Sequence, residues 1–153
     1  FFIVFRLMKK RIMPVIGGGK RPLSLVYVRD VARSVRHCLG REEAISKVYH
    51  VAAEPPSSDE MLSQEIAAQM GVRPLRLILP ASTLYPLCLA QEALSRLTGR
   101  PSILNRQKVA ELRAPGWVCT TEQIRRDLGF EAATSLVDGV RGSLAWYRSR
   151  GWL

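Results

Sequence analysis

The segment 24–35 constrains the fold most strongly, because its sequence changes from strand-like to helical character within a few residues. Residues 25–28 are aliphatic or aromatic, as in a largely buried strand. Asp30 follows where a helix N-cap or first-turn acid stabilises the positive end of a helix. Val31 and Val35 then give that helix an apolar face. The segment predicts a strand that turns directly into a helix.

The rest of the chain alternates short apolar runs with amphipathic stretches, which is typical of an α/β fold. We expect further strands at 47–52 and 75–80. We expect helices at 1–12, 30–40, 57–71, 81–98, 105–112, 120–129 and 135–148, with Ser57, Asn105, Thr120 and Ser135 at their starts. Pro86 lies inside the fourth of these helices and predicts a kink or a restart.

The charge of the chain is strongly positive, at +10 for 153 residues. A surplus of this size fits an anionic partner, such as a phosphate-bearing cofactor, nucleic acid or acidic lipid. It equally fits a solvated, arginine-rich surface. Since no nucleic-acid motif or interleaving of aromatic and basic residues accompanies the charge, we favour the solvated surface and expect no nucleic-acid partner.

The three cysteines, Cys38, Cys88 and Cys119, are widely spaced and form no CxxC pair. They predict neither a disulfide framework nor a metal site. A reducing cytoplasmic location follows from this usage. The apolar run 1–5 is far shorter than the roughly 20 residues that a membrane-spanning helix needs. We expect a core-facing amphipathic helix at 1–12, with an interfacial membrane helix as the alternative.

Two motifs carry a resemblance to a known family. A Pro-Val-Ile-Gly-Gly-Gly loop at 14–19 precedes Ser-Leu-Val-Tyr-Val-Arg-Asp-Val-Ala at 24–32, and Arg-Arg-Asp-Leu-Gly-Phe at 125–130 precedes Trp-Tyr-Arg at 146–148. In order and spacing these resemble the part of the extended short-chain dehydrogenases, the NAD-dependent epimerase/dehydratase family, that follows the catalytic core. The resemblance implies a fragment of an NAD(P)-binding Rossmann-type fold, with short strands and a mostly helical substrate-binding subdomain.

The motifs that perform catalysis in this family do not occur in the sequence. No Gly-rich turn joins a strand to a helix, and none of the tyrosines is followed four residues later by lysine. We therefore expect residues 1–153 to be one C-terminal substrate-binding portion, with the N-terminal dinucleotide-binding half absent. The parent protein would bind NAD or NADP, and this chain alone would bind neither. We expect no catalytic, cofactor-binding or metal-binding residue in the chain.

The resemblance places the substrate beside the glycine loop and the segment after it. The implied substrate-binding residues are Gly17, Gly18, Gly19, Lys20, Arg21 and Tyr27. Solvation of the two loop cations, and packing of the tyrosine, are the alternative interpretations. Where members that act on nucleotide sugars carry Arg and Asp, this chain has Leu23 and Ser24. That difference favours the branch similar to 3β-hydroxysteroid dehydrogenases and dihydroflavonol reductases.

The predicted function is substrate binding within an NAD(P)-dependent oxidoreductase or epimerase. That enzyme would act at a secondary alcohol or ketone carbon of a sugar-like or hydrophobic substrate. The expected partners are this small molecule, the missing half of the protein and, through uncovered apolar patches, a second copy in a homodimer. The alternative function is a stand-alone basic module that binds nucleic acid or an acidic membrane surface.

Overall fold

The computed structural model describes residues 1–16, 20–99 and 106–153. Its helices are α1 (Phe2–Lys9), α2 (Val28–Cys38), α3 (Asp59–Met70), α4 (Leu84–Thr98), α5 (Arg106–Arg113), α6 (Glu122–Leu128) and α7 (Leu136–Ser149). Its strands are β1 (Ile12–Ile16), β2 (Pro22–Leu23), β3 (Ser57–Ser58) and β4 (Leu75–Leu79). Short 3₁₀ turns at Glu42–Ala44 and Ala81–Thr83 complete the elements. The predicted α/β class is confirmed.

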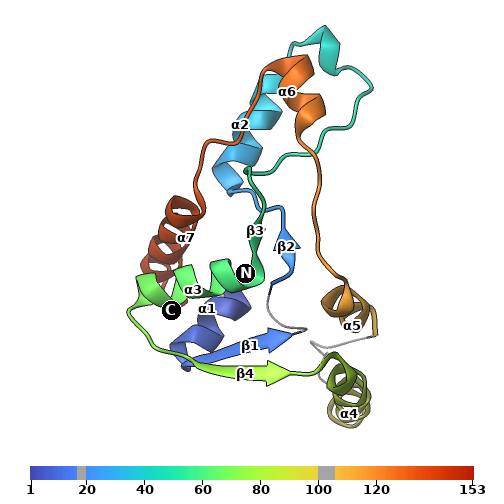
Figure 1. Ribbon diagram of the computed structural model, residues 1–153, viewed down its shortest axis with the longest axis vertical. Helices are drawn as coiled ribbons and strands as arrows, with labels where there is room; N and C mark the ends of the chain where they lie inside the picture. The colour runs from blue at the N-terminus through green and yellow to red at the C-terminus, as the bar shows by residue number, and fades with distance from the viewer. Residues whose placement is uncertain (17–19, 100–105) are drawn as a thin grey trace.

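The strands form two small sheets. β1 and β4 pair in parallel, in a register that places Ile12 opposite Leu75, and the chain between them includes α2 and α3. β2 and β3 make a two-residue antiparallel pair. Figure 1 shows β4 as the outer strand of the parallel pair, with no further described strand beside it.

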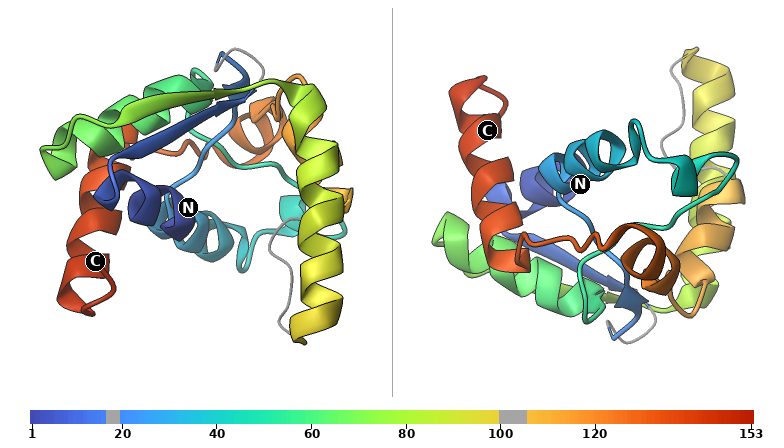
Figure 2. Two further views of the ribbon diagram at one scale, coloured as in Figure 1. Left: turned by 90° about the horizontal axis from the view of Figure 1, so that it is seen from below. Right: turned by 90° about the horizontal axis from the view of Figure 1, so that it is seen from above.

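The main hydrophobic core lies where α1, β1, α3 and α7 meet. Phe5 and Met8 of α1 are buried against Val15 of β1, Ile66 of α3 and Val140 of α7. Figure 2 shows α1 beside α7 in both views, with the strands running past them. The predicted core-facing role of the first helix is confirmed, because its apolar stripe covers the sheet.

Two smaller clusters lie away from this core, so the chain has separate packing centres in its described part. At the far end in Figure 1, Ile124, Leu128 and Phe130 of the α6 region pack with Cys38 at the end of α2. Cys88 of α4 and Val109 of α5 form a third, small cluster.

Two predicted strands are wrong. Residues 25–27 belong to no strand, Val28 already begins α2, and 47–52 is irregular. Single hydrogen bonds take the place of a ladder: the Ala53 N–H donates to the Leu25 carbonyl at 2.7 Å, and the Ser24 N–H donates to the Trp117 carbonyl at 2.7 Å. β-propensity alone does not make a strand, because a strand needs a continuous partner.

Several helix boundaries move by a few residues. α1 ends at Lys9 because Arg11 takes a left-handed φ of 59° before β1 begins. Ser58, and not Ser57, caps α3: its hydroxyl accepts from the Met61 N–H at 3.0 Å. Thr121 replaces the predicted Thr120 as the residue before α6.

Other predictions about the helix ends are confirmed. Ser135 caps α7 by accepting from the Asp138 N–H at 3.1 Å. Gly71 ends α3 in the left-handed conformation, at φ 66°. The restart expected at Pro86 occurs because α4 begins at Leu84, which places the proline in the first turn, where it needs no backbone donor. The predicted cap Asn105 lies outside the described residues.

Candidate functional site

A pocket of about 100 Å³ lies between the segment that follows β2 and the first half of α7. Its walls are mostly hydrocarbon, and a few hydroxyl groups reach into it. The apolar lining includes Phe1, Phe5, Leu25, Leu62, Leu136 and Val140, and the polar lining includes Tyr27, Ser57, Thr134, Ser135 and Ser143. The lining matches that of small-molecule sites, which is mostly apolar with a few polar groups.

Tyr27 contributes a phenol side chain to the wall of this pocket. It is the residue before α2, with extended backbone, and its ring lies against α7. A side chain at Gly139 would begin 3.6 Å from the ring, and one at Gly142 would begin 2.5 Å from the hydroxyl oxygen. Among the described residues, the Tyr27 hydroxyl makes no hydrogen bond to the protein. The two glycines therefore admit the ring, and its hydroxyl keeps its capacity to bind a ligand.

Asp30 connects α2 to the segment that leads into α7. Its carboxylate accepts from the Thr134 N–H at 2.9 Å, just before α7, and from the Arg33 guanidinium at 2.7 Å, and only 1% of the residue is exposed. Burial raises the pKa of this carboxyl, but the hydrogen bonds from Thr134 and the bond and charge of Arg33 outweigh it, so the pKa is lowered. Asp30 is an ionised structural anchor for the wall that carries Tyr27.

The two predicted cations, Lys20 and Arg21, do not line this pocket. Arg21 donates from Nε to Asp59 at 2.9 Å and from its guanidinium to the Leu112 carbonyl, so it ties the chain before β2 to α3 and α5. Lys20 is exposed on the approach to β2. Gly17, Gly18 and Gly19 lie outside the described residues. Of the predicted residues that the structure describes, Tyr27 alone reaches the pocket.

The residues that sequence reasoning missed come mainly from the two ends of the chain. Phe1 and Phe5 of the α1 region close one side, and Thr134 and Ser143 close the other. The pair Gly139 and Gly142 inside a predicted helix was the available signal, because glycine within a helix often marks a close approach by another group.

Four of the described helices begin with a turn that does not fit a dinucleotide pyrophosphate. Such a group binds where free backbone N–H groups meet no competing negative charge. The first turns of α2, α3, α6 and α7 instead carry acids: Asp30, Asp59 with Glu60, Glu122, and Asp138. We therefore derive no chemical step through NAD(P) on this chain.

The described part of the chain, residues 1–16, 20–99 and 106–153, lacks two kinds of feature. It contains no group of three or more His, Cys, Asp or Glu side chains placed to hold a metal ion. None of its helices has the length and hydrophobicity needed to cross a bilayer.

No protein-family model matches the chain. Among curated proteins, it is similar to a ceramide reductase of Caulobacter vibrioides, at 25% identity over 143 residues. The match covers 93% of this chain and 44% of the reductase. The chain thus spans less than half the length of this relative.

Solved structures share the fold at low sequence identity. An epimerase of Methanothermobacter thermautotrophicus matches 97% of this chain with 37% of its own, at a TM-score of 0.71 and 14% identity. A UDP-glucose 4-epimerase of Thermotoga maritima, solved with UDP-glucose, matches 97% of this chain with 38% of its own, at 0.67 and 15%. A dTDP-glucose 4,6-dehydratase of Bacillus anthracis, in complex with NAD, matches 96% of this chain with 38% of its own, at 0.63 and 10%.

The resemblance drawn from the two sequence motifs is therefore confirmed at the level of the fold. The neighbours include epimerases and a dehydratase, and each match takes in nearly all of this chain and under two-fifths of the neighbour. The chain has the α/β fold of a part of the Rossmann-type NAD-dependent epimerases and dehydratases.

Proposed function

We propose that this chain is the C-terminal, substrate-binding part of an NAD(P)-dependent oxidoreductase or epimerase. The enzyme acts at a secondary alcohol or ketone carbon of a hydrophobic substrate, and a separate part of the same protein binds the dinucleotide. Support comes from the share of each neighbour that the chain covers, from its lack of a Tyr-x-x-x-Lys motif, and from the acidic first turns of α2, α3, α6 and α7.

The observation that carries this proposal is the apolar pocket with Tyr27 in its wall. Its hydrocarbon lining suits an alkyl or ring system, and transfer of such a group from water is favourable in proportion to the apolar area buried. A sugar nucleotide would instead need cations beside its diphosphate. Arg21 is already paired with Asp59, and neither Lys20 nor Arg21 lines the pocket. The curated relative, whose name states that it reduces a ceramide, agrees with a hydrophobic substrate.

Within this proposal the chain positions the substrate and performs no step of the chemistry. The Tyr27 hydroxyl donates a hydrogen bond to an oxygen atom of the substrate, and the aromatic and aliphatic walls exclude water from the bound alkyl group. No catalytic residue is assigned to these 153 residues.

Two uncovered apolar faces suit the dinucleotide-binding part as a partner. On α2, Val28, Val35 and Leu39 are 69%, 57% and 73% exposed and lie at helical spacing. On β4, Leu75 and Leu77 lie on the same face of the strand and are 73% and 47% exposed. Parallel sheets are normally covered on both faces, so a pair of strands with this exposure suits the edge of a larger sheet. A second copy of the chain is the alternative occupant of these faces.

We also propose a cytoplasmic location. Cys38, Cys88 and Cys119 all belong to the described part of the chain, and none of them is joined to another by a disulfide. Unlinked cysteines are typical of a reducing compartment.

Calorimetric titration of the chain with a long-chain methyl ketone, and separately with UDP-glucose, tests the substrate class. We expect the ketone to bind and Tyr27→Phe to weaken it by about 2- to 12-fold, the equivalent of one neutral hydrogen bond of about 0.5–1.5 kcal/mol. Tyr49→Phe is the matched control, because Tyr49 bonds to Asp127 and the Glu43 carbonyl and does not line the pocket.

Two results would count against the proposal. Binding of UDP-glucose without binding of the ketone would replace the hydrophobic substrate by a sugar nucleotide. Tight binding of NADH to this chain alone, measured by the fluorescence of the nicotinamide, would contradict the division between a dinucleotide-binding part and a substrate-binding part.

A further inference from the structure

The two ends of the chain form an aromatic cluster on the surface. The Trp152 ring lies 5.1 Å from Trp146, 5.4 Å from Phe2 and 6.0 Å from Tyr147, as distances between ring centroids. Trp146 and Trp152 are 47% and 53% exposed. α1 therefore presents two different faces, since Phe5 and Met8 are buried in the core while Phe2 joins this cluster.

Basic side chains surround these rings. Arg6 lies over the Phe2 ring at 5.8 Å, and Arg150 lies over the Trp146 ring at 5.8 Å. Lys9 and Lys10 complete a groove of about 670 Å³ together with Phe2, Arg6 and Trp152. The resulting surface, here called the aromatic–basic patch, consists of Phe2, Arg6, Lys9, Lys10, Trp146, Arg148, Arg150 and Trp152.

The charge of the patch is not neutralised within the described structure. None of its five cations forms an ion pair there. Residues 1–29 and 139–153, which supply the whole patch, contain no Asp or Glu. Among the described residues, Glu65 of α3 shares a neighbouring pocket with Arg148. An uncompensated positive surface of this kind attracts an anionic partner.

We propose that the aromatic–basic patch binds the anionic surface of a lipid bilayer. Indole rings with one apolar and one polar edge favour the headgroup region, and neighbouring Lys and Arg side chains add attraction to acidic lipids. The association is peripheral, and it does not depend on the proposed enzymatic function.

The packing of the rings favours a bilayer over a nucleic acid. Single-stranded nucleic acids bind where aromatic faces are open for base stacking. Here Trp146 and Trp152 meet edge to face at 77°, the Trp152 ring stacks on Tyr147 at 19°, and Arg150 covers Trp146. The exposed part of the cluster suits shallow insertion among lipids better than stacking of successive bases.

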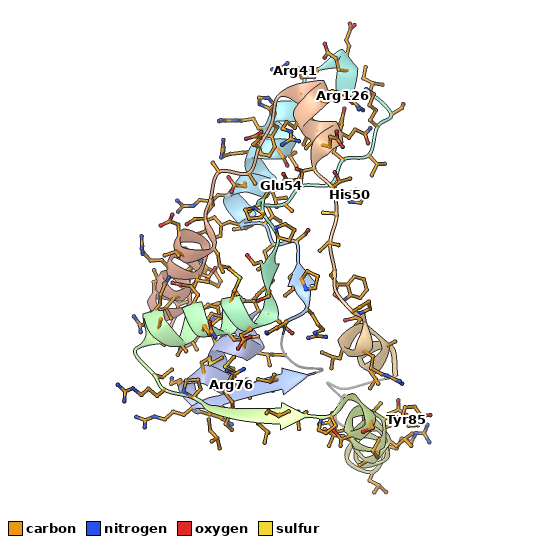
Figure 3. The ribbon with its side chains drawn as sticks, viewed as in Figure 1. Arg41, His50, Glu54, Arg76, Tyr85 and Arg126 are labelled. Carbon is orange, nitrogen blue, oxygen red and sulfur yellow. The ribbon has the colours of Figure 1, made fainter. Side chains whose placement is uncertain are left out.

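Co-sedimentation of the chain with vesicles tests the proposal. The vesicles are phosphatidylcholine alone and phosphatidylcholine with one-third phosphatidylglycerol. We expect binding to the acidic vesicles, and we expect Lys9→Gln with Lys10→Gln to weaken it about 25-fold, at about 5-fold for each cation near the surface. The matched control is Arg36→Gln with Arg41→Gln, which removes the same charge; Figure 3 shows Arg41 at the end of the molecule occupied by α2 and α6. We expect it to change binding by less than about 2-fold.

A fluorescence measurement locates the contact. The three tryptophans are Trp117, Trp146 and Trp152, so a Trp117→Phe chain reports on the patch alone. We expect its emission to shift to the blue when acidic vesicles are added.

Three results would overturn the proposal. They are equal weakening by the patch pair and the control pair, an unchanged tryptophan emission, and preferential binding of a single-stranded oligonucleotide that competes with the vesicles for the patch. The second and third do not depend on the stability of any lysine variant. A failure of vesicle binding leaves ketone binding in the Tyr27 pocket unaffected, so the two proposals fail separately.

Discussion

The contact between Tyr27 and α7 makes a sharp prediction about the two glycines of that helix. Both lie inside Leu136–Ser149, so replacing either by alanine should gain about 1 kcal/mol of helix propensity. They differ in what a new methyl group would meet. At Gly139 the nearest atom is 3.6 Å away, which is ordinary contact, whereas at Gly142 the Tyr27 hydroxyl oxygen is 2.5 Å away.

We expect Gly139→Ala to stabilise the chain by about 1 kcal/mol. Gly142→Ala should gain the same propensity but lose about 1–3 kcal/mol to overpacking, because the Tyr27 ring must move away from the helix. The free energies of unfolding of the two variants should therefore differ by about 1–3 kcal/mol. Urea denaturation followed by circular dichroism measures that difference directly.

Removing the ring provides the control. In a Tyr27→Ala background the obstacle to a methyl group at Gly142 is gone, so both alanine substitutions should stabilise to a similar extent, and a double-mutant cycle isolates the contact. If Gly142→Ala stabilises the unmodified chain as much as Gly139→Ala does, the ring does not rest on α7 as described. The geometry assigned to the pocket would then be wrong.

Two further substitutions test other parts of the fold. Asp30→Asn should destabilise the chain by about 1–3 kcal/mol at pH 7. Because the folded-state pKa of Asp30 is lowered, the stability that its charge contributes is complete above the unfolded pKa of about 3.9 and is lost as pH falls through the folded value. The difference in unfolding free energy between the unmodified chain and Asp30→Asn, measured by urea denaturation, should therefore close below about pH 4. A difference that stays constant with pH would contradict the role of the charge. Gly116→Ala should lower the free energy of unfolding by about 1–3 kcal/mol, because its methyl group would begin 2.7 Å from Pro22 Cγ and 2.9 Å from the Pro22 carbonyl oxygen. An unchanged free energy of unfolding in the same assay would show that the backbone around Gly116 can move to accommodate the methyl group.

Local patterns predicted the helices well. The amphipathic helix predicted at 1–12, the glycine stop at Gly71 and the serine cap at Ser135 are each found where the sequence placed them, or within a few residues. These features depend on neighbours three or four positions apart, so a single sequence contains the information that specifies them. At two helix starts the predicted residue lies one position early: Ser58 caps α3, and Thr121 precedes α6, although the Thr120 hydroxyl still accepts from the Glu122 N–H at 3.3 Å.

Strands were predicted less reliably. The segment 47–52 is rich in β-branched and aromatic residues, yet it forms no strand, whereas 75–79 pairs with β1 across more than fifty residues. Whether an extended segment becomes a strand depends on the partner that reaches it, and that partner is set by the path of the whole chain.

The candidate site likewise depends partly on local sequence and partly on tertiary packing. The sequence by itself determined the helices to within a few residues, the serine cap of α7, the basic charge and the segment that places Tyr27 ahead of α2, because these follow from local spacing and composition. Only the tertiary structure decided that Tyr27 meets Gly142, that Arg21 is paired with Asp59, and that the two ends of the chain join in one aromatic–basic patch. Contacts between residues far apart in the sequence depend on how the whole chain packs, and a local sequence pattern does not specify that packing.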